Sequence, residues 1–403
     1  MRSKLLALAL LTACSQASPP PNPPPAPPPA PAALPTVEAR NAPPPASATP
    51  PPAPTPRAIE HAAFGKIDGK DVWLFTLTNQ HGLTVKITNF GATVTAVLVP
   101  DRSGKLADIV LGYENAEGYA TGSVFLGATI GRTANRIRDA KFKLEGKDYT
   151  LAPNDKPHNL HGGPTGWSKR IWDAVPTETA AGPALKLTYV SKDGEEGFPG
   201  TVTATTTYTL TQKDELEVEM EAVSDRTTIV NMAHHSYWNL GGVGSGPITD
   251  HELTLFADAY TPGDPQVPTG AIKPVKGTPF DFTTAKPVGK DLAKTGGKPL
   301  GYDHNFVVRG DANALRPVAK LRDPKSGRVL TLEANQPGVQ VYSGNFLDGS
   351  IHEKGTSYGQ YGAICLETQK FPNAVNVPAW REQVILKAGE KYRHVMVHRF
   401  SVE

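Results

Sequence analysis

Cysteine is nearly absent from this sequence. The 403 residues contain only Cys14 and Cys365, whose contexts differ too much for a disulfide framework. An excess of one charge is also missing, since 41 Lys and Arg residues face 39 Asp and Glu residues, for a formal net charge of +2. Such a chain has no overall field that would draw it to nucleic acid. We therefore expect a fold held together by its hydrophobic core, a small neutral ligand and no nucleic-acid partner.

Long apolar runs are scarce as well. The run at residues 5–11 follows two basic residues and is too short to span a bilayer as a helix, so it predicts an export signal. It ends in Leu-Thr-Ala-Cys, which resembles the bacterial lipoprotein box. We expect residues 1–13 to be a lipoprotein signal peptide, cut before Cys14, which then carries lipid. We expect an exported, periplasmic protein whose lipid anchor lies in the outer membrane, since Ser15 is not the Asp that resemblance associates with retention in the inner membrane. The sequence leaves open which membrane holds the anchor. An ordinary signal peptide with a coincidental Cys is the alternative.

Apolar periodicity is missing from residues 19–56, which are mostly Pro and Ala. Such a segment cannot bury enough surface to offset its loss of conformational entropy. We therefore interpret residues 14–57 as a disordered Pro/Ala-rich tether and residues 58–403 as the folded domain. A Pro-rich ligand for a binding domain ranks lower, because no flanking charge pattern accompanies the prolines.

Helical periodicity is also absent from the folded part. Short alternating runs are separated by Gly, Asn, Asp and Pro clusters, and no Gly-rich loop enters a helix. Residues 201–210 and 215–222 are the clearest pair, and they predict an antiparallel hairpin with one face in the core. We expect an all-β fold, a single large antiparallel β-sandwich, because the strands are spread evenly without an internal repeat. Similar alternation occurs at residues 72–78, 84–87, 94–99, 251–256 and 392–400.

Five segments carry more polar residues than a strand or turn requires. Together they contain Arg, His, Asp, Glu, Asn and aromatic side chains. A pocket of that composition suits a polyhydroxylated ligand, whose hydroxyl groups donate and accept while its C–H faces pack on aromatic rings. The segments are residues 131–137 (GRTANRI), 159–163 (NLHGG), 234–240 (HHSYWNL), 301–306 (GYDHNF) and 366–369 (LETQ).

Glu367 stands where the chain would otherwise remain buried, because it follows the apolar run at residues 363–366. Burial raises the pKa of a carboxyl group, and a carboxyl group near neutrality can take a proton from a hydroxyl group and return it. A structural glutamate in a salt bridge with Arg136 or Arg132 is the alternative.

His234 and His235 are adjacent in a segment that is expected to be extended. If residues 229–235 form one strand, the two side chains point to opposite faces, with His235 on the face of Asn231 and Ala233. His234 is then a structural residue. The pair cannot share one metal ion, and neither a His-x-x-x-His helix nor a Cys-rich cluster is present, so we expect no metal site.

Taken in this order, the polar segments resemble those of the aldose 1-epimerase family, also called galactose mutarotases. The resemblance runs from about Phe64 to Phe400. It implies the galactose mutarotase-like supersandwich, a single antiparallel β-sandwich that agrees with the alternation above. The further motifs that carry it are NFGA (89–92), VPDR (99–102), GFPG (197–200), GTPFDF (277–282) and QPGVQ (336–340).

The resemblance also implies an isomerase that interconverts the α and β anomers of free aldohexoses such as glucose and galactose. Glu367 matches the family's catalytic base and His235 its acid. The base takes the proton of the anomeric hydroxyl group while the acid protonates the ring oxygen, so the ring opens and recloses without a cofactor. The positions that match sugar-binding residues of the family are Asn135, Arg136, His161, Asp303 and Gln340.

Two positions depart from the family pattern. His234 stands where Asn is expected, and Asn159 stands where a His often precedes Leu-His-Gly-Gly. Two other functions stay open: a non-catalytic carbohydrate-binding sandwich on a lipid tether, and a mutarotase for phosphorylated sugars, which an exported location disfavours. The motifs leave the preferred aldose and the oligomeric state open.

Overall fold

The computed structural model describes residues 59–264 and 266–403. The expected signal peptide, the lipidation site Cys14 and the whole of the expected tether lie outside the described residues. Within the described ranges, no helix has the length and apolar character needed to cross a bilayer. The expected export, lipid anchor and tether therefore stay predictions.

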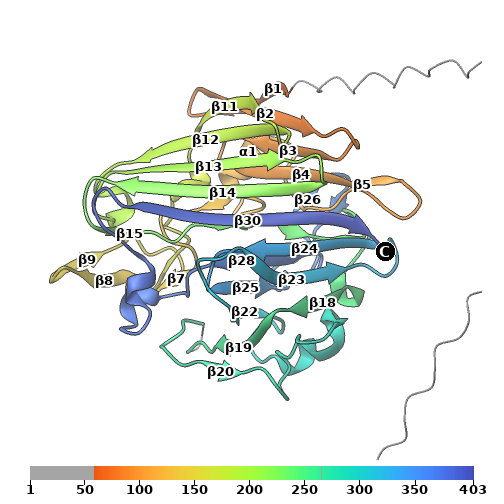
Figure 1. The fold of residues 1–403 in the computed structure, drawn as a ribbon. Helices are drawn as coiled ribbons and strands as arrows, with labels where there is room; N and C mark the ends of the chain where they lie inside the picture. The colour runs from red at the N-terminus through yellow and green to blue at the C-terminus, as the bar shows by residue number, and fades with distance from the viewer. Residues whose placement is uncertain (1–58, 265) are drawn as a thin grey trace, which may run out of the picture. The chain divides into compact units, whose positions relative to one another are not determined.

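The largest layer is a nine-stranded sheet in which every neighbouring pair is antiparallel. Figure 1 shows its strands lying side by side across the molecule. In spatial order the strands are β11 (Asp173–Glu178), β12 (Pro183–Ser191), β13 (Val202–Leu210), β14 (Glu215–Ser224), β30 (Lys391–Val402), β24 (Arg328–Ala334), β23 (Arg316–Arg322), β18 (Glu252–Leu255) and β21 (Lys286–Pro287).

Two further sheets complete the sandwich. The six-stranded sheet carries the chemistry described below. Its strands in order are β17 (Tyr237–Trp238), β28 (Ile364–Gln369), β25 (Gly338–Tyr342), β22 (Asp303–Val308), β19 (Ala257–Thr261) and β20 (Lys273–Pro274). The five-stranded sheet is a meander of β1 (Glu60–Ile67), β2 (Lys70–Thr78), β3 (Thr84–Thr88), β4 (Thr93–Pro100) and β5 (Leu106–Asp108).

Short elements connect these sheets. In the described part of the chain, α1 (Ala116–Thr121) is the one α-helix. The two-stranded pairs are β6 (Thr129–Ile130) with β16 (Ala233–His234), β7 (Arg136–Ile137) with β10 (Asn159–Leu160), β8 (Lys141–Leu144) with β9 (Lys147–Thr150), β15 (Thr228–Ile229) with β29 (Ile385–Leu386), and β26 (His352–Glu353) with β27 (Thr356–Ser357). The 3₁₀ helices are Arg138–Ala140, Trp167–Lys169, Glu195–Gly197, Ile248–Asp250, Val288–Lys294, Ala374–Asn376 and Arg381–Gln383.

One hydrophobic cluster joins all three sheets. It includes Val85 and Val97 of the five-stranded sheet, Val218 of the nine-stranded sheet, and Val339 and Leu366 of the six-stranded sheet, all almost completely buried. β-Branched and aliphatic side chains at every second position of a strand favour this arrangement. The structure is therefore a single antiparallel β-sandwich, as the alternation predicted.

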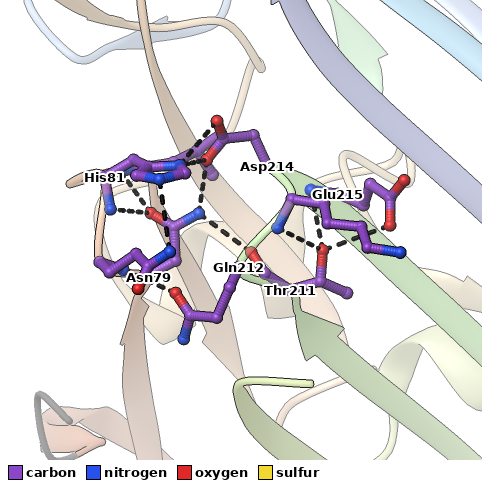
Figure 2. A network of polar contacts seen from close by, with 9 residues as sticks. Asn79, His81, Thr211, Gln212, Asp214 and Glu215 are labelled. Carbon is purple, nitrogen blue, oxygen red and sulfur yellow. Dashed lines mark hydrogen bonds and ion pairs between the residues drawn. The ribbon is translucent and has the colours of Figure 1, made fainter. Parts of the chain in front are cut away.

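Polar contacts tie the five-stranded sheet to the nine-stranded sheet at one edge. Figure 2 shows Asn79, in the β2–β3 turn, donating to the Thr211 carbonyl at 3.0 Å and to Asp214 Oδ1 at 2.6 Å in the β13–β14 turn. His81 Nδ1 lies 3.0 Å from Asp214 Oδ2 in the same network. Because Asn79 is almost completely buried, these bonds satisfy an amide that would otherwise be costly to bury.

The predicted hairpin and strands are confirmed, with one exception. β13 and β14 pair in the expected hairpin, with Leu210 opposite Leu216. The expectation of one strand over residues 229–235 is wrong, because β15 and β16 are separate two-residue strands. Between them the backbone changes partners: the Val230 N–H donates to Val384 O and the Asn231 N–H to Arg132 O. The segment thus leaves β29 and reaches β6.

Candidate active site

Glu367 lies on β28, where alternate residues face opposite sides. Ile364 and Leu366 belong to the main hydrophobic cluster, so Cys365 and Glu367 share the other face. The Glu367 side chain is 2% exposed, its Oε1 lies 3.5 Å from Nε2 of His235, and its buried Oε2 has no hydrogen-bond partner among the described residues. Burial raises the pKa of Glu367 well above its usual range, the charge of Asp303 adds to this, and Arg136 opposes it.

Neither arginine forms the structural salt bridge considered for Glu367. Arg132 is buried and donates to the carbonyl groups of Pro199 and Gly200 at 2.6 and 3.0 Å. Arg136 pairs through Nε with Asp155 Oδ2 at 2.6 Å. Among the residues that the structure describes, the one basic side chain within 4.0 Å of the Glu367 carboxyl group is His235. The carboxyl group is therefore not committed to a structural arginine.

His235 follows β16 and is almost as buried as Glu367. Burial lowers its pKa to about 4, although its own backbone carbonyl group opposes the shift. At neutral pH both shifts favour a protonated Glu367 beside a neutral His235. Transfer of that one proton yields a carboxylate and an imidazolium, so the pair can act as base and acid together.

His234 points away from this pair. Its Nε2 lies 2.8 Å from Ser236 Oγ, and its ring lies near those of Tyr208 and His398 inside the sandwich. The two adjacent histidines thus face opposite sides, as expected, although not on one continuous strand. Asn159, the other departure, donates to the Ala152 carbonyl at 2.7 Å and makes a local structural contact.

His161 meets the pair from a different segment, directly after β10. Its ring centroid lies 5.2 Å from that of His235. Its Nδ1 accepts the backbone N–H of Asn135 at 3.2 Å, so the neutral ring carries its proton on Nε2. Burial lowers the pKa of His161 well below its usual range, and His235 and Arg136 lower it further. His161 is therefore a fixed neutral donor.

His161, His235 and Glu367 place three possible ligand atoms within 4.8 Å of one another. The reasoning against a metal site considered adjacent histidines, a His-x-x-x-His helix and Cys-rich clusters, and it missed this trio from three separate segments. A histidine that ligates a metal normally donates its second ring N–H to an acceptor. Since Nδ1 of His161 accepts an N–H instead, coordination through Nε2 would require a ring without either proton. The donor set therefore does not suit a resident metal ion.

Asp303 and Gln340 stand on neighbouring strands β22 and β25. Gln340 Nε2 donates to Asp303 Oδ1 at 2.6 Å, and Gln340 is the register partner of Glu367. A cavity of about 320 Å³ is lined by Asp303 and Gln340, whereas His235 and Glu367 do not line it. It holds the mixture of carboxylate, amide and aromatic groups expected for a sugar. Its lining includes Asn135, Asp303, Gln340, Tyr260, Phe280 and Phe346.

The structure thus brings together every expected site residue within the folded part, and it adds two that the sequence reasoning missed. Cys365 Sγ lies 3.6 Å from Nδ1 of His235, and its position two residues before Glu367 could have revealed the shared face. Phe125 packs on His161 with ring centroids 4.7 Å apart. Phe125 lies in an irregular loop with positive φ, for which the sequence carries no signal.

Comparison with known proteins identifies the same family that the sequence motifs resemble. The family model for aldose 1-epimerase matches residues 74–399. The galactose mutarotase of Rattus norvegicus is 41% identical over 86% of this chain and 99% of its own. The aldose 1-epimerase of Escherichia coli (strain K12) is 33% identical over 83% of this chain and 97% of its own. The crystal structure of galactose 1-epimerase from Lactobacillus acidophilus superposes with a TM-score of 0.76, at 30% identity, over 85% of this chain and 98% of that one.

Proposed function

The chain belongs to the aldose 1-epimerase family and is an isomerase of aldose anomers, for which we propose Glu367 as the base and His235 as the acid. One observation carries these roles. The buried carboxyl group and the imidazole lie 3.5 Å apart, and among the described residues Glu367 Oε2 has no hydrogen-bond partner. The register partner of Glu367 is Gln340, which lines the polar cavity. A module that only binds carbohydrate has no need of such a pair.

Ring opening begins from the charged form of the pair. The Glu367 carboxylate takes the proton of the anomeric O1–H, and the electrons of that bond form the C1=O1 double bond. As the C1–O5 bond breaks, its electrons pass to O5, which takes the Nε2 proton of His235. The open-chain complex then holds a protonated Glu367 and a neutral His235, the state that burial favours.

Rotation about C1–C2 presents the other face of the aldehyde. His235 then removes the proton from O5–H while Glu367 returns a proton to O1, so the ring recloses as the other anomer. Each residue ends as it began. No covalent intermediate forms, and no oxidant or reductant is consumed.

Sugar binding falls to the groups around the pair. His161 offers Nε2–H as a donor, and Asp303 offers carboxylate oxygens to sugar hydroxyl groups. Gln340 is held by its hydrogen bond to Asp303. Asn135 lies in the loop before β7 and donates its backbone N–H to His161, and Arg136 is the first residue of β7 and donates its backbone N–H to Asn135 Oδ1. Donors near O5 and C1 stabilise the charge that develops there.

We also propose that the substrates are free aldohexoses, which an exported, lipid-anchored enzyme would meet. The support is the Leu-Thr-Ala-Cys sequence ending at Cys14 and the Pro/Ala-rich stretch after it. Cells that express the full chain, labelled with a radioactive fatty acid, should yield a labelled protein. Cys14→Ala should remove the label, and an unlabelled parent chain would contradict the anchor.

Polarimetry with the purified full chain tests the substrate class. Freshly dissolved α-glucose, α-galactose and α-xylose should each lose their initial optical rotation faster with enzyme than in buffer, with the hexoses leading. A ranking with xylose first would contradict the hexose proposal while leaving the isomerase intact. The phosphorylated-sugar alternative predicts that glucose 6-phosphate outperforms glucose.

A further inference from the structure

Cys365 is the buried nucleophilic side chain that the mechanism leaves unused. It is completely buried on β28, and its Sγ lies 3.6 Å from Nδ1 of His235. Glu367, two residues further along the same strand, lies against Nε2 of the same ring. One strand therefore contacts both nitrogens of the imidazole, with the sulfur at one end and the carboxyl group at the other.

We propose that Cys365 is a positioning residue for the general acid: its sulfur holds Nδ1 of His235 and so directs Nε2 toward Glu367 and the sugar. The inference rests on the proposed function, because it assumes that His235 is the acid. Two contacts made from one strand define the rotation of a ring more closely than one contact can.

The chemical character of the sulfur matters as well as its place. Burial raises the pKa of the Cys365 thiol well above its usual range, and the charges of Glu367 and Asp303 raise it further, so the group stays uncharged. Sulfur is a weak acceptor. When His235 is an imidazolium, Nδ1–H therefore meets a partner that stabilises the charge only slightly.

A weak partner keeps the imidazolium a strong acid. A carboxylate at Nδ1 would stabilise the charged ring and weaken it as a proton donor, whereas the ether-like ring oxygen of a sugar is a poor base and needs a strong donor. The other ionisable groups that face His235 are Glu367 from β28, His161 from the β10 loop and Tyr237 from its own segment. None of them contacts Nδ1.

Three substitutions separate positioning from packing. Cys365→Ala removes both the volume and the partner, Cys365→Val keeps the site filled without a partner, and Cys365→Ser keeps a polar partner in a smaller side chain. Thr368→Ser is the matched control: it removes one methyl group from the opposite face of β28, where the hydroxyl group contacts His394 at 2.8 Å. It should cost similar stability without touching the site.

Polarimetric kcat and KM should be measured from pH 4 to 9 for these variants. We expect kcat of Cys365→Ala and Cys365→Val to fall about 10-fold or more, by analogy with the loss when the orienting partner of a metal-ligating histidine is removed. KM should be nearly unchanged, because Cys365 does not line the cavity proposed to hold the sugar. Cys365→Ser should recover part of kcat, and its acid limb should lie at higher pH than that of Cys365→Ala, because a hydroxyl oxygen accepts from Nδ1–H better than a methyl group can.

Other outcomes would overturn the inference. Cys365→Val with full activity would mean that the thiol only fills space, and so would equal kcat for Cys365→Ala and Cys365→Ser. The Ala and Ser variants decide the matter even if Cys365→Val fails to fold. His235→Asn separates this inference from the mechanism: if His235→Asn is inactive but Cys365→Ala is normal, only the positioning role fails. If His235→Asn is fully active, the proposed acid fails instead.

Discussion

Glu367→Gln is the substitution whose outcome follows most closely from the structure. The amide keeps the shape of the side chain but cannot take the anomeric proton. General acid–base catalysis contributes roughly 10²- to 10⁴-fold to a rate, which corresponds to about 3 to 5 kcal/mol of barrier. We expect kcat to fall within that range while sugar binding survives, because Asp303, Gln340 and His161 are unchanged.

The same substitution should leave the fold intact. Burial raises the pKa of Glu367 and so disfavours its charged form, whereas the amide is neutral and brings no charge that must be buried. The midpoint of thermal unfolding should therefore stay the same or rise. This expectation separates loss of the base from loss of structure.

Polarimetry gives kcat and KM, and isothermal titration calorimetry with galactose gives the affinity. Glu333→Gln is a matched control, since it makes the same change on β24 of the nine-stranded sheet, outside the site. If Glu367→Gln keeps more than a tenth of the parent kcat, Glu367 is not the base. If galactose binding is lost as well, Glu367 acts mainly in binding.

Four further outcomes are expected. His235→Asn should lose nearly all turnover, whereas His234→Asn should change kcat little, because His234 faces the core; equal losses by polarimetry would reject that distinction. Burial lowers the pKa of His394 to about 3 and of His398 to about 4, from 6.5. Between pH 6.5 and 4 both are neutral in the folded state and protonated in the unfolded state, so their contribution to stability is full above pH 6.5 and is lost as the pH falls. This pair alone lowers stability by up to about 2.7 kcal/mol per pH unit in that range; urea unfolding that shows no loss would contradict it. Asn79→Ala should cost about 1 to 3 kcal/mol of unfolding free energy, because it leaves buried groups without partners, with kcat unchanged; a normal urea midpoint would show that the Asn79 network is dispensable. Dialysis against EDTA should leave kcat unchanged, and a loss that Zn²⁺ restores would show that the His161 argument is wrong.

The alternation of side chains was enough to predict much of the fold. In a half-buried strand every second residue faces the core and is apolar, so the sequence pattern alone predicted β13, β14 and β30. The segment around His235 could not be read in this way. Its backbone changes partners between β29 and β6, and this depends on residues far away in the chain.

The sequence predicted which residues belong to the site better than it predicted which residues they contact. Glu367 was expected to be buried because it directly follows an apolar run, and the structure confirms that it is buried. The partners of Arg132 and Arg136 could not be predicted, because each partner lies at least 19 residues away. The contact between Cys365 and His235 joins positions 130 residues apart, and only the folded sheet brings them together.

The central claim is that this protein exchanges sugar anomers. The most direct test is the optical rotation of freshly dissolved α-galactose with increasing amounts of the full chain. The account predicts a first-order decay whose rate rises in proportion to the enzyme and whose final rotation equals that reached in buffer, since an isomerase cannot move the equilibrium. A decay rate equal to that of buffer at every enzyme concentration would contradict the account.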